Sequence, residues 1–148
     1  MDDGSVKATT GGDWIAEERG KVLEYLERQG IQSGQIGQWP AWQMPPYLAV
    51  WAAESFATPG QVGWWVISGA VPTDYVGFHE AGQPREVIRH FARQWAELSH
   101  FMLRGEPHPE MNVGGPDQWP ELGDLLQRRA AILDQLAADD SVWEDDNT

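Results

Sequence analysis

The sequence contains no cysteine. Without a thiol the chain cannot form a disulfide, bind a metal through thiolates or use a cysteine nucleophile, and this composition fits the reducing cytoplasm. No apolar run approaches the roughly 20 residues that a membrane-spanning helix needs. The segment MDDGSVKATTGGD at residues 1–13 lacks the apolar core of a secretory signal. We therefore expect a cytoplasmic protein with no membrane segment.

Basic residues are also scarce. Ten Lys and Arg residues stand against 23 Asp and Glu residues, which gives a formal net charge of -13. A protein of this charge is repelled by nucleic-acid phosphates and by anionic membrane surfaces. A macromolecular partner is therefore expected to be a basic protein. The sequence also lacks a phosphate-binding loop and a dinucleotide fingerprint, so no cofactor is expected.

The length of 148 residues suits one domain with a core of its own. Composition predicts a disordered N-terminal lead-in at residues 1–12, a single globular domain at 13–138 and an acidic C-terminal tail at 139–148. Trp143 interrupts this tail, and its large ring would dock either on the domain or on a partner. We therefore include Trp143 among the candidate binding residues.

Apolar residues recur at helical spacing in three segments. Asp13 is a suitable N-cap for the first helix, and Gly30 can adopt the left-handed conformation that ends it. Asp117 is a suitable cap for the third helix. The expected helices run from Trp14 to about Gln29, from Pro84 to the stop at Gly105, and from about Gln118 to Ala138.

Two segments are rich in the aromatic and β-branched residues that favour strands, and they span Tyr47–Glu54 and Val62–Ser68. Thr58-Pro59-Gly60 between them is a turn signature, which predicts a hairpin. The Gly-, Gln- and Pro-rich segment 32–46 predicts a loop. Both faces of each strand are apolar, so helices are expected to cover the sheet. These elements predict a small α+β domain, with an antiparallel β-hairpin or sheet packed against three α-helices.

The central part of the chain combines low charge with a large aromatic area. It has no Lys or Arg between Arg28 and Arg85, and it holds five of the nine tryptophans. Core positions are expected for Trp51, Trp65 and Trp95. Trp39 and Trp42 flank a proline in the expected loop, so we predict that they are exposed binding residues. Exposed rings stack on sugars or anchor protein interfaces, so both kinds of binding module remain open.

Polar residues follow the second strand, and the candidate catalytic residues among them are Ser68, Asp74, Tyr75 and His79. No Gly-x-Ser-x-Gly motif surrounds the serine, which is more simply the end of a strand. Asp74 is more simply a turn residue whose carboxylate bonds backbone amides after Pro72-Thr73. The paired carboxylates of a glycoside hydrolase would have to be Glu54 and Asp74. A working catalytic site is therefore not expected here.

A metal site would need converging ligands. Glu86, His90 and Glu97 are placed near one another on the outer side of the second helix. No H-E-x-x-H or related ligand spacing is present, and Arg89 and Arg93 share the helix. A solvated helix face is therefore the preferred interpretation, and no metal is expected.

Several segments resemble a known family. They are Tyr47-Leu48-Ala49-Val50-Trp51, Trp64-Trp65-Val66-Ile67-Ser68-Gly69 with Pro72-Thr73-Asp74-Tyr75, Arg85-Glu86-Val87-Ile88-Arg89-His90-Phe91, and Gln94-Trp95. Their pattern is similar to that of a family of small uncharacterised bacterial proteins, classed as a domain of unknown function, over roughly Trp14 to Met102. The resemblance implies a bacterial, cytoplasmic setting and supplies no activity, cofactor or catalytic residue.

The acidic charge, the aromatic residues and the missing catalytic motifs together favour a non-enzymatic interaction module that binds a basic protein. An immunity or inhibitor protein for a toxin is one specific form, because electrostatic complementarity speeds capture. The alternatives are a small hydrolase or ligand-binding protein with a site near Ser68, Asp74 and Tyr75, and an aromatic carbohydrate-binding module.

Overall fold

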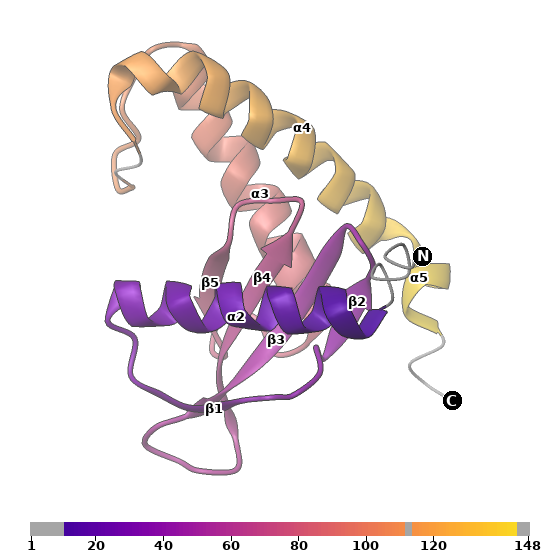
Figure 1. Cartoon of the computed structure of the whole chain (residues 1–148). Coiled ribbons are helices and arrows are strands. Elements are labelled where there is room, and N and C mark those ends of the chain that lie inside the picture. The colour runs from indigo at the N-terminus through magenta and orange to yellow at the C-terminus, as the bar shows by residue number, and fades with distance from the viewer. Residues whose placement is uncertain (1–10, 112–113, 145–148) are drawn as a thin grey trace, which may run out of the picture. The chain divides into compact units, whose positions relative to one another are not determined.

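The computed structural model describes residues 11–111 and 114–144. The chain divides into two compact units, Met1–Pro84 and Arg85–Thr148. The first contains one long helix and a five-stranded sheet, and the second contains helices (Figure 1). The α+β class predicted from the sequence is confirmed. Within the described residues, no helix combines the length and the apolar character that crossing a bilayer requires.

The first helix is α2 (Gly11–Gln29). It begins two residues before Asp13, which therefore lies in the first turn and is not the N-cap. Gly30 does adopt the predicted left-handed conformation, with a φ of 69°. The amides of Gly30 and Ile31 donate to the carbonyl oxygens of Glu27 and Leu26, each at 3.1 Å, as in a Schellman motif. The end of α2 is thus correctly predicted, and its start is not.

The sheet is entirely antiparallel, and its main order is β1-β3-β4-β5, with β2 also paired to β3. The predicted hairpin is confirmed as β3 (Leu48–Ser55) and β4 (Val62–Gly69). Three short strands were not predicted: β1 (Ser33–Ile36), β2 (Trp42–Met44) and β5 (Asp74–Gly77). The segment 32–46 is therefore not only a loop, and Asp74 opens a strand rather than standing in a turn.

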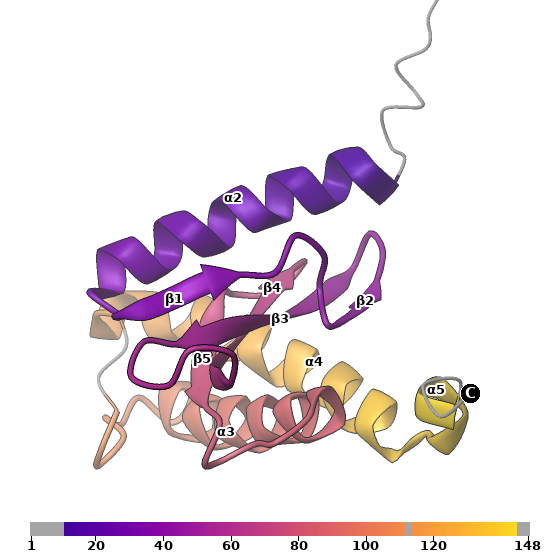
Figure 2. The ribbon, with the colours of Figure 1, turned by 90° about the horizontal axis from the view of Figure 1, so that it is seen from below.

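Helix α2 crosses one face of this sheet, as both views of the ribbon show (Figures 1 and 2). Its inward stripe meets alternate residues of the two long strands, because side chains of a strand alternate between faces. The buried cluster formed in this way consists of Ile15, Val22, Leu26, Ile36, Ala49, Trp51, Ala53 and Val66. Residues of the opposite face, such as Val50 and Ile67, are also fully buried. The apolar character predicted for both strand faces is thus matched by their burial.

Gly69 ends β4 with a φ of 123°. A Cβ atom at this position would collide with the carbonyl oxygen of Tyr47, which instead accepts a hydrogen bond from the Ala70 amide at 2.8 Å. Only glycine combines this dihedral with such a close backbone approach. The glycine that the sequence places at the end of the strand is therefore required by geometry.

The C-terminal unit is a helical hairpin followed by a short helix. Helix α3 (Pro84–Leu103) starts and stops as predicted, with Gly105 at a φ of 72° after its last turn. A 3-10 turn, η1 (Pro116–Gln118), leads into α4 (Trp119–Ala138), whose N-cap is Gln118 and not Asp117. The two long helices pack closely where Gly123 faces Met102 and Leu103.

The segment predicted as an acidic tail contains a helix, α5 (Asp140–Glu144). Trp143 is buried, and its indole N–H donates to the carbonyl oxygen of Leu136 at 2.9 Å. Arg85 donates to the Ala137 carbonyl oxygen at 2.8 Å and pairs with Asp140 at 2.6 Å. Docking of this tryptophan on the chain itself therefore orders the first part of the predicted tail.

The predicted ends of the domain lie partly beyond the described residues. Gly11 and Gly12, assigned to the lead-in, already belong to α2, whereas residues 1–10 and 145–148 fall outside the described ranges. The boundaries 13–138 of a single globular domain stay a prediction.

Candidate functional site

Ser68 is a buried structural residue in this fold. It lies near the end of β4, opposite Ala49 of β3, and has no exposed surface. Its hydroxyl oxygen accepts a hydrogen bond from the indole N–H of Trp51 at 3.1 Å. A buried tryptophan needs a partner for that N–H, so the serine satisfies a core aromatic residue. This explains its presence without any catalytic role.

Asp74 connects the start of β5 with α2. One carboxylate oxygen accepts the backbone N–H of Tyr75 at 2.8 Å and the hydroxyl of Tyr25 at 3.4 Å. Bonding of this carboxylate to a backbone amide was predicted and is confirmed. Burial, followed by the charge of the Asp74 carboxylate, raises the pKa of Tyr25 above its ordinary value. The protonated Tyr25 hydroxyl therefore donates its hydrogen bond to Asp74 at neutral pH.

Tyr75 continues this cluster as an aromatic contact. Its ring centroid lies 6.1 Å from that of Tyr25 and 5.6 Å from that of Trp64, the latter in an edge-to-face arrangement. His79 is exposed in the turn after β5. The structure thus joins Asp74 and Tyr75 through Tyr25, which sequence reasoning did not include, whereas Ser68 bonds with Trp51 instead.

Glu54, the other half of the possible carboxylate pair, fastens two segments of backbone. Its two carboxylate oxygens accept the N–H of Gln35 at 3.0 Å and of Gly60 at 2.7 Å. These two bonds, in that order, lower the pKa of Glu54 below its ordinary value. The residue also borders a cavity of about 360 Å³ beside Gly60. Its carboxylate holds β1 to the β3–β4 turn, which is a structural task.

The candidate binding tryptophans differ sharply in exposure. Trp39 is 66% exposed, whereas Trp42 is 8% exposed and pairs with Val50 in the sheet. The prediction that Trp42 is exposed is therefore wrong, because β2 draws this residue into the sheet. Trp143 is buried against α4, as described above. The predicted core positions of three tryptophans are confirmed, and they are Trp51, Trp65 and Trp95.

Trp39 borders a groove along α2, which we call the α2–Trp39 groove. It has a volume of about 330 Å³ and is lined by Ile15, Ala16, Arg19, Gly20, Leu23, Gln38 and Trp39. Leu23 is the second large apolar residue of the groove that is exposed. The groove thus presents two exposed large apolar side chains, Leu23 from the helix and Trp39 from the loop.

Arg19 fixes the loop that carries Trp39. Its Nε donates to the carbonyl oxygen of Gly37, and its Nη2 donates to that of Ile36, both at 3.0 Å. Two bonds from one planar guanidinium set both the position and the direction of the backbone that they hold. The loop is thus tied to α2 two residues before Trp39.

An acidic stripe runs along α2 beside this groove. Asp13, Glu17, Glu24 and Glu27 are all exposed. At 3.6 residues per turn they share one side of the helix with Gly20 of the groove. Lys21 and Arg28 lie on the side of the stripe away from the groove, and Lys21 pairs with Glu18 at 2.9 Å. The groove therefore combines exposed apolar side chains with a negatively charged margin.

The residues considered for a metal site are used differently. Glu97 bonds to His108 at 2.6 Å, and the His90 ring stands edge-on to Phe91. Across the ranges that the structure describes, no three His, Cys, Asp or Glu side chains are grouped so that they could hold a metal ion.

Sequence reasoning missed Arg19 and Leu23. Leu23 had a signal, because it is a large apolar residue that does not belong to the inward stripe of α2. Arg19 had none, because its partners are 17 and 18 residues further along the chain.

Comparison with known proteins gives one finding. Neither the curated proteins nor the solved structures contain a match. A family model does match residues 9–143, which covers most of the chain and includes the acidic stripe, the groove and both long helices of the C-terminal unit. The chain therefore belongs to the family described as Domain of unknown function (DUF4826).

Proposed function

We propose that this chain is a non-enzymatic protein-interaction module that binds a basic protein in the cytoplasm through the α2–Trp39 groove. The observation that carries the proposal is the position of Trp39. This ring is exposed beside the acidic stripe of α2, and Arg19 ties its loop to the helix. A loop whose backbone is already held loses little conformational freedom on binding, so more of the contact energy of the residue that it carries contributes to affinity.

The charge of the molecule supports a basic partner. The formal net charge is -13, and the four acidic residues of the stripe stand next to the groove itself. A negative field accelerates association with a positive surface, by up to about 10³-fold at low salt. Trp39 would then supply the short-range contact, because tryptophan is among the residues that most often dominate binding energy. An inhibitor or immunity protein for a basic toxin is a specific form of this function.

The hydrogen bonds made by two of the candidate catalytic residues also support a non-enzymatic role. The Ser68 hydroxyl bonds to Trp51, and the Asp74 carboxylate bonds to Tyr25 and Tyr75. Stacking on a sugar by Trp39 and Trp42 together is not favoured, because Trp42 is buried. No observation therefore favours the hydrolase or the carbohydrate-binding module over protein binding.

A pull-down from the native cytoplasm tests the proposal. The bait is the wild-type chain, Trp39→Ala or Phe56→Ala, at about 50 mM and about 500 mM salt. Phe56 is a matched control, because it is 65% exposed against 66% for Trp39 and lies in the β3–β4 turn. We expect a basic protein that wild type and Phe56→Ala retain at low salt, and that Trp39→Ala loses. The proposal is contradicted if no protein is captured. It is also contradicted if the same protein is captured at both salt concentrations and by Trp39→Ala as well as by wild type.

A further inference from the structure

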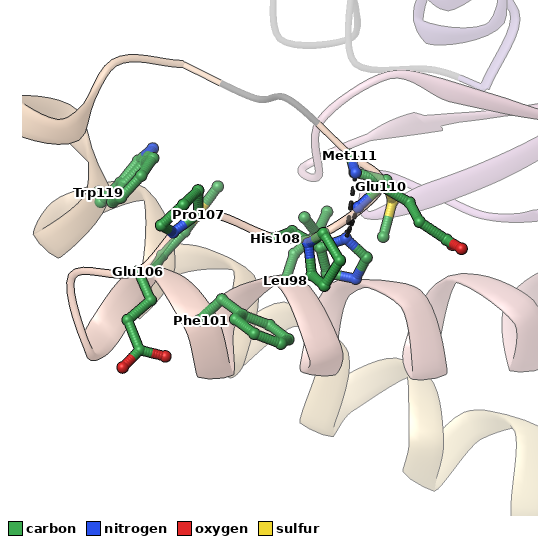
Figure 3. Close-up of a pocket in the computed structure, with 10 residues that line it drawn as sticks. Leu98, Phe101, Glu106, Pro107, His108, Glu110, Met111 and Trp119 are labelled. Atoms are coloured by element: carbon green, nitrogen blue, oxygen red, sulfur yellow. Dashed lines mark hydrogen bonds between the residues drawn. The ribbon is translucent and has the colours of Figure 1, made fainter.

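The C-terminal unit contains a pocket of about 200 Å³ at the end of α3. Its wall is formed by the last turns of α3, the segment 106–111 and Trp119 at the start of α4 (Figure 3). Leu98, Phe101, Met102 and Met111 contribute its apolar lining. An apolar cavity of about 150 Å³ is sufficient for a benzene ring. The pocket can therefore hold one aromatic ring with a short chain attached.

His108 locks the segment that forms one side of this pocket. Its Nδ1 accepts the backbone N–H of Glu110 at 2.9 Å and of Met111 at 3.1 Å (Figure 3). Because Nδ1 accepts two amide protons, the ring proton is assigned to Nε2, which donates to Glu97 at 2.6 Å. The His108 side chain is 4% exposed, and its ring stands edge-on to Phe101 at 5.0 Å.

Two consequences follow for a ligand. Both ring nitrogens of His108 are already bonded within the chain, so the imidazole offers an apolar wall rather than a free polar group. The same bonds hold Met111 in position before any ligand arrives, which lowers the ordering cost of binding. The interior of the pocket is thus preformed and suited to an apolar group.

The mouth of the pocket has the opposite character. Glu106 and Glu110 border it and are exposed, and Figure 3 shows both side chains extending away from the apolar lining. Glu106 is paired with Arg104 at 3.3 Å. Glu110 belongs to the segment that His108 holds and adds a second carboxylate. An anionic ligand would be repelled here, whereas a protonated amine would gain a favourable charge interaction.

We propose that this pocket is a binding site for a small apolar amine, with its ring or branched aliphatic body among Leu98, Met111 and Trp119 and its ammonium group beside Glu110. This inference does not depend on the proposed function, because the α2–Trp39 groove belongs to the other unit of the chain.

Titration of the isotope-labelled full chain by NMR tests the site with three probes of one shape: phenethylamine, 2-phenylethanol and 3-phenylpropionate. We expect saturable shifts of the Trp119 indole N–H and the Met111 methyl group, with affinity in the order amine, alcohol, carboxylate. The absence of saturable shifts at these two groups with the amine overturns the proposal. Equal or tighter binding of the carboxylate also overturns it.

Two variants separate the mouth from the interior. Glu110→Gln should weaken the amine about two- to fivefold, as expected for an exposed ion pair, and leave the alcohol unchanged. Glu86→Gln, in the first turn of the same α3 helix, is the control and should change neither. Met111→Ala should weaken both probes while circular dichroism shows a folded chain. The proposed site is contradicted if Glu110→Gln binds the amine as tightly as wild type does. It is also contradicted if Met111→Ala is folded and binds the amine as tightly as wild type does.

Discussion

Arg19 and Gly37 are joined by a hydrogen bond of 3.0 Å between the guanidinium Nε of the first and the carbonyl oxygen of the second. With the second bond, from Nη2 to the carbonyl oxygen of Ile36, it connects α2 to the end of β1 and to the loop before β2. Trp39 follows two residues later. Trp39 is the one exposed tryptophan among the residues that the structure describes, and an arginine of α2 holds the loop that carries it.

Replacing Arg19 by Ala should loosen this loop. Two hydrogen bonds from a charged group to partly exposed carbonyls contribute about 1–2 kcal/mol to the free energy of unfolding. We expect a loss of this size in urea denaturation, together with weaker binding of the basic partner. Arg128→Ala is the control, because Arg128 pairs with Asp124 on an exposed helix surface and should cost less than about 0.5 kcal/mol. Equal losses for the two variants would show that Arg19 does not hold the loop.

Replacing tryptophan by alanine should change the free energy of unfolding much more at Trp143 than at Trp39. Trp143→Ala removes a buried ring and the partner of the Leu136 carbonyl oxygen, so the free energy of unfolding should fall by about 3 kcal/mol. Trp39→Ala removes an exposed ring and should change it by less than about 0.5 kcal/mol. Urea denaturation measures both. A small effect at Trp143 would mean that docking of α5 adds little to stability.

Replacing glycine by alanine should change the free energy of unfolding in opposite directions at Gly69 and at Gly20. Gly69→Ala introduces strain at a positive φ and a collision with the Tyr47 carbonyl oxygen, so we expect a loss of about 1–3 kcal/mol or more. Gly20→Ala lies within α2, where a Cβ meets nothing within 4 Å, and should gain about 0.5–1 kcal/mol. Thermal or urea unfolding measures both. A stabilising Gly69→Ala would contradict the tight approach between β3 and β4.

The free energy of unfolding should fall at alkaline pH, because Tyr25 in the first unit resists losing its proton while the chain is folded. The pKa of Tyr25 is raised in the folded chain above the ordinary value of 10.0, by burial first and by Asp74 second. The unfolded chain therefore loses this proton at lower pH than the folded chain does. The stability from Tyr25 is complete below about pH 10 and declines as the pH rises further.

Urea denaturation at several pH values above neutrality measures this decline. Tyr25→Phe should have a shallower decline between about pH 10 and pH 11 than wild type does. Asp74→Asn removes the charge and the charged hydrogen-bond acceptor but keeps burial, the largest cause, so it should retain most of the wild-type decline. An identical slope in wild type and Tyr25→Phe would show that Tyr25 is not responsible.

Elements with strong local signals were predictable from the sequence. The hairpin of β3 and β4 has long apolar strands and a turn signature, and the end of α2 depends on Gly30 and its neighbours alone. The strands β1, β2 and β5 each have three or four residues and exist because they pair with the hairpin. Such pairing is non-local, so short Gly- and Gln-rich segments do not reveal it.

The candidate site was predictable to a smaller degree. The exposure of Trp39 followed from its place in a proline-containing loop, whereas the same argument failed for Trp42, which enters the sheet through β2. The bond between Arg19 and Gly37, and the bond between Tyr25 and Asp74, join residues that are 18 and 49 positions apart. Long-range bonds of this kind leave no periodic pattern in a sequence.

The affinity of the purified basic partner for the α2–Trp39 groove tests the central claim most directly. Isothermal titration at about 50 mM and about 500 mM salt would compare wild type, Trp39→Ala and the control Phe56→Ala. We expect Trp39→Ala to weaken binding at least about 30-fold, which corresponds to a hot-spot loss of about 2 kcal/mol. Wild type and Phe56→Ala should bind alike and lose affinity as salt rises. Equal affinity of Trp39→Ala and Phe56→Ala, or binding that does not respond to salt, would contradict the account.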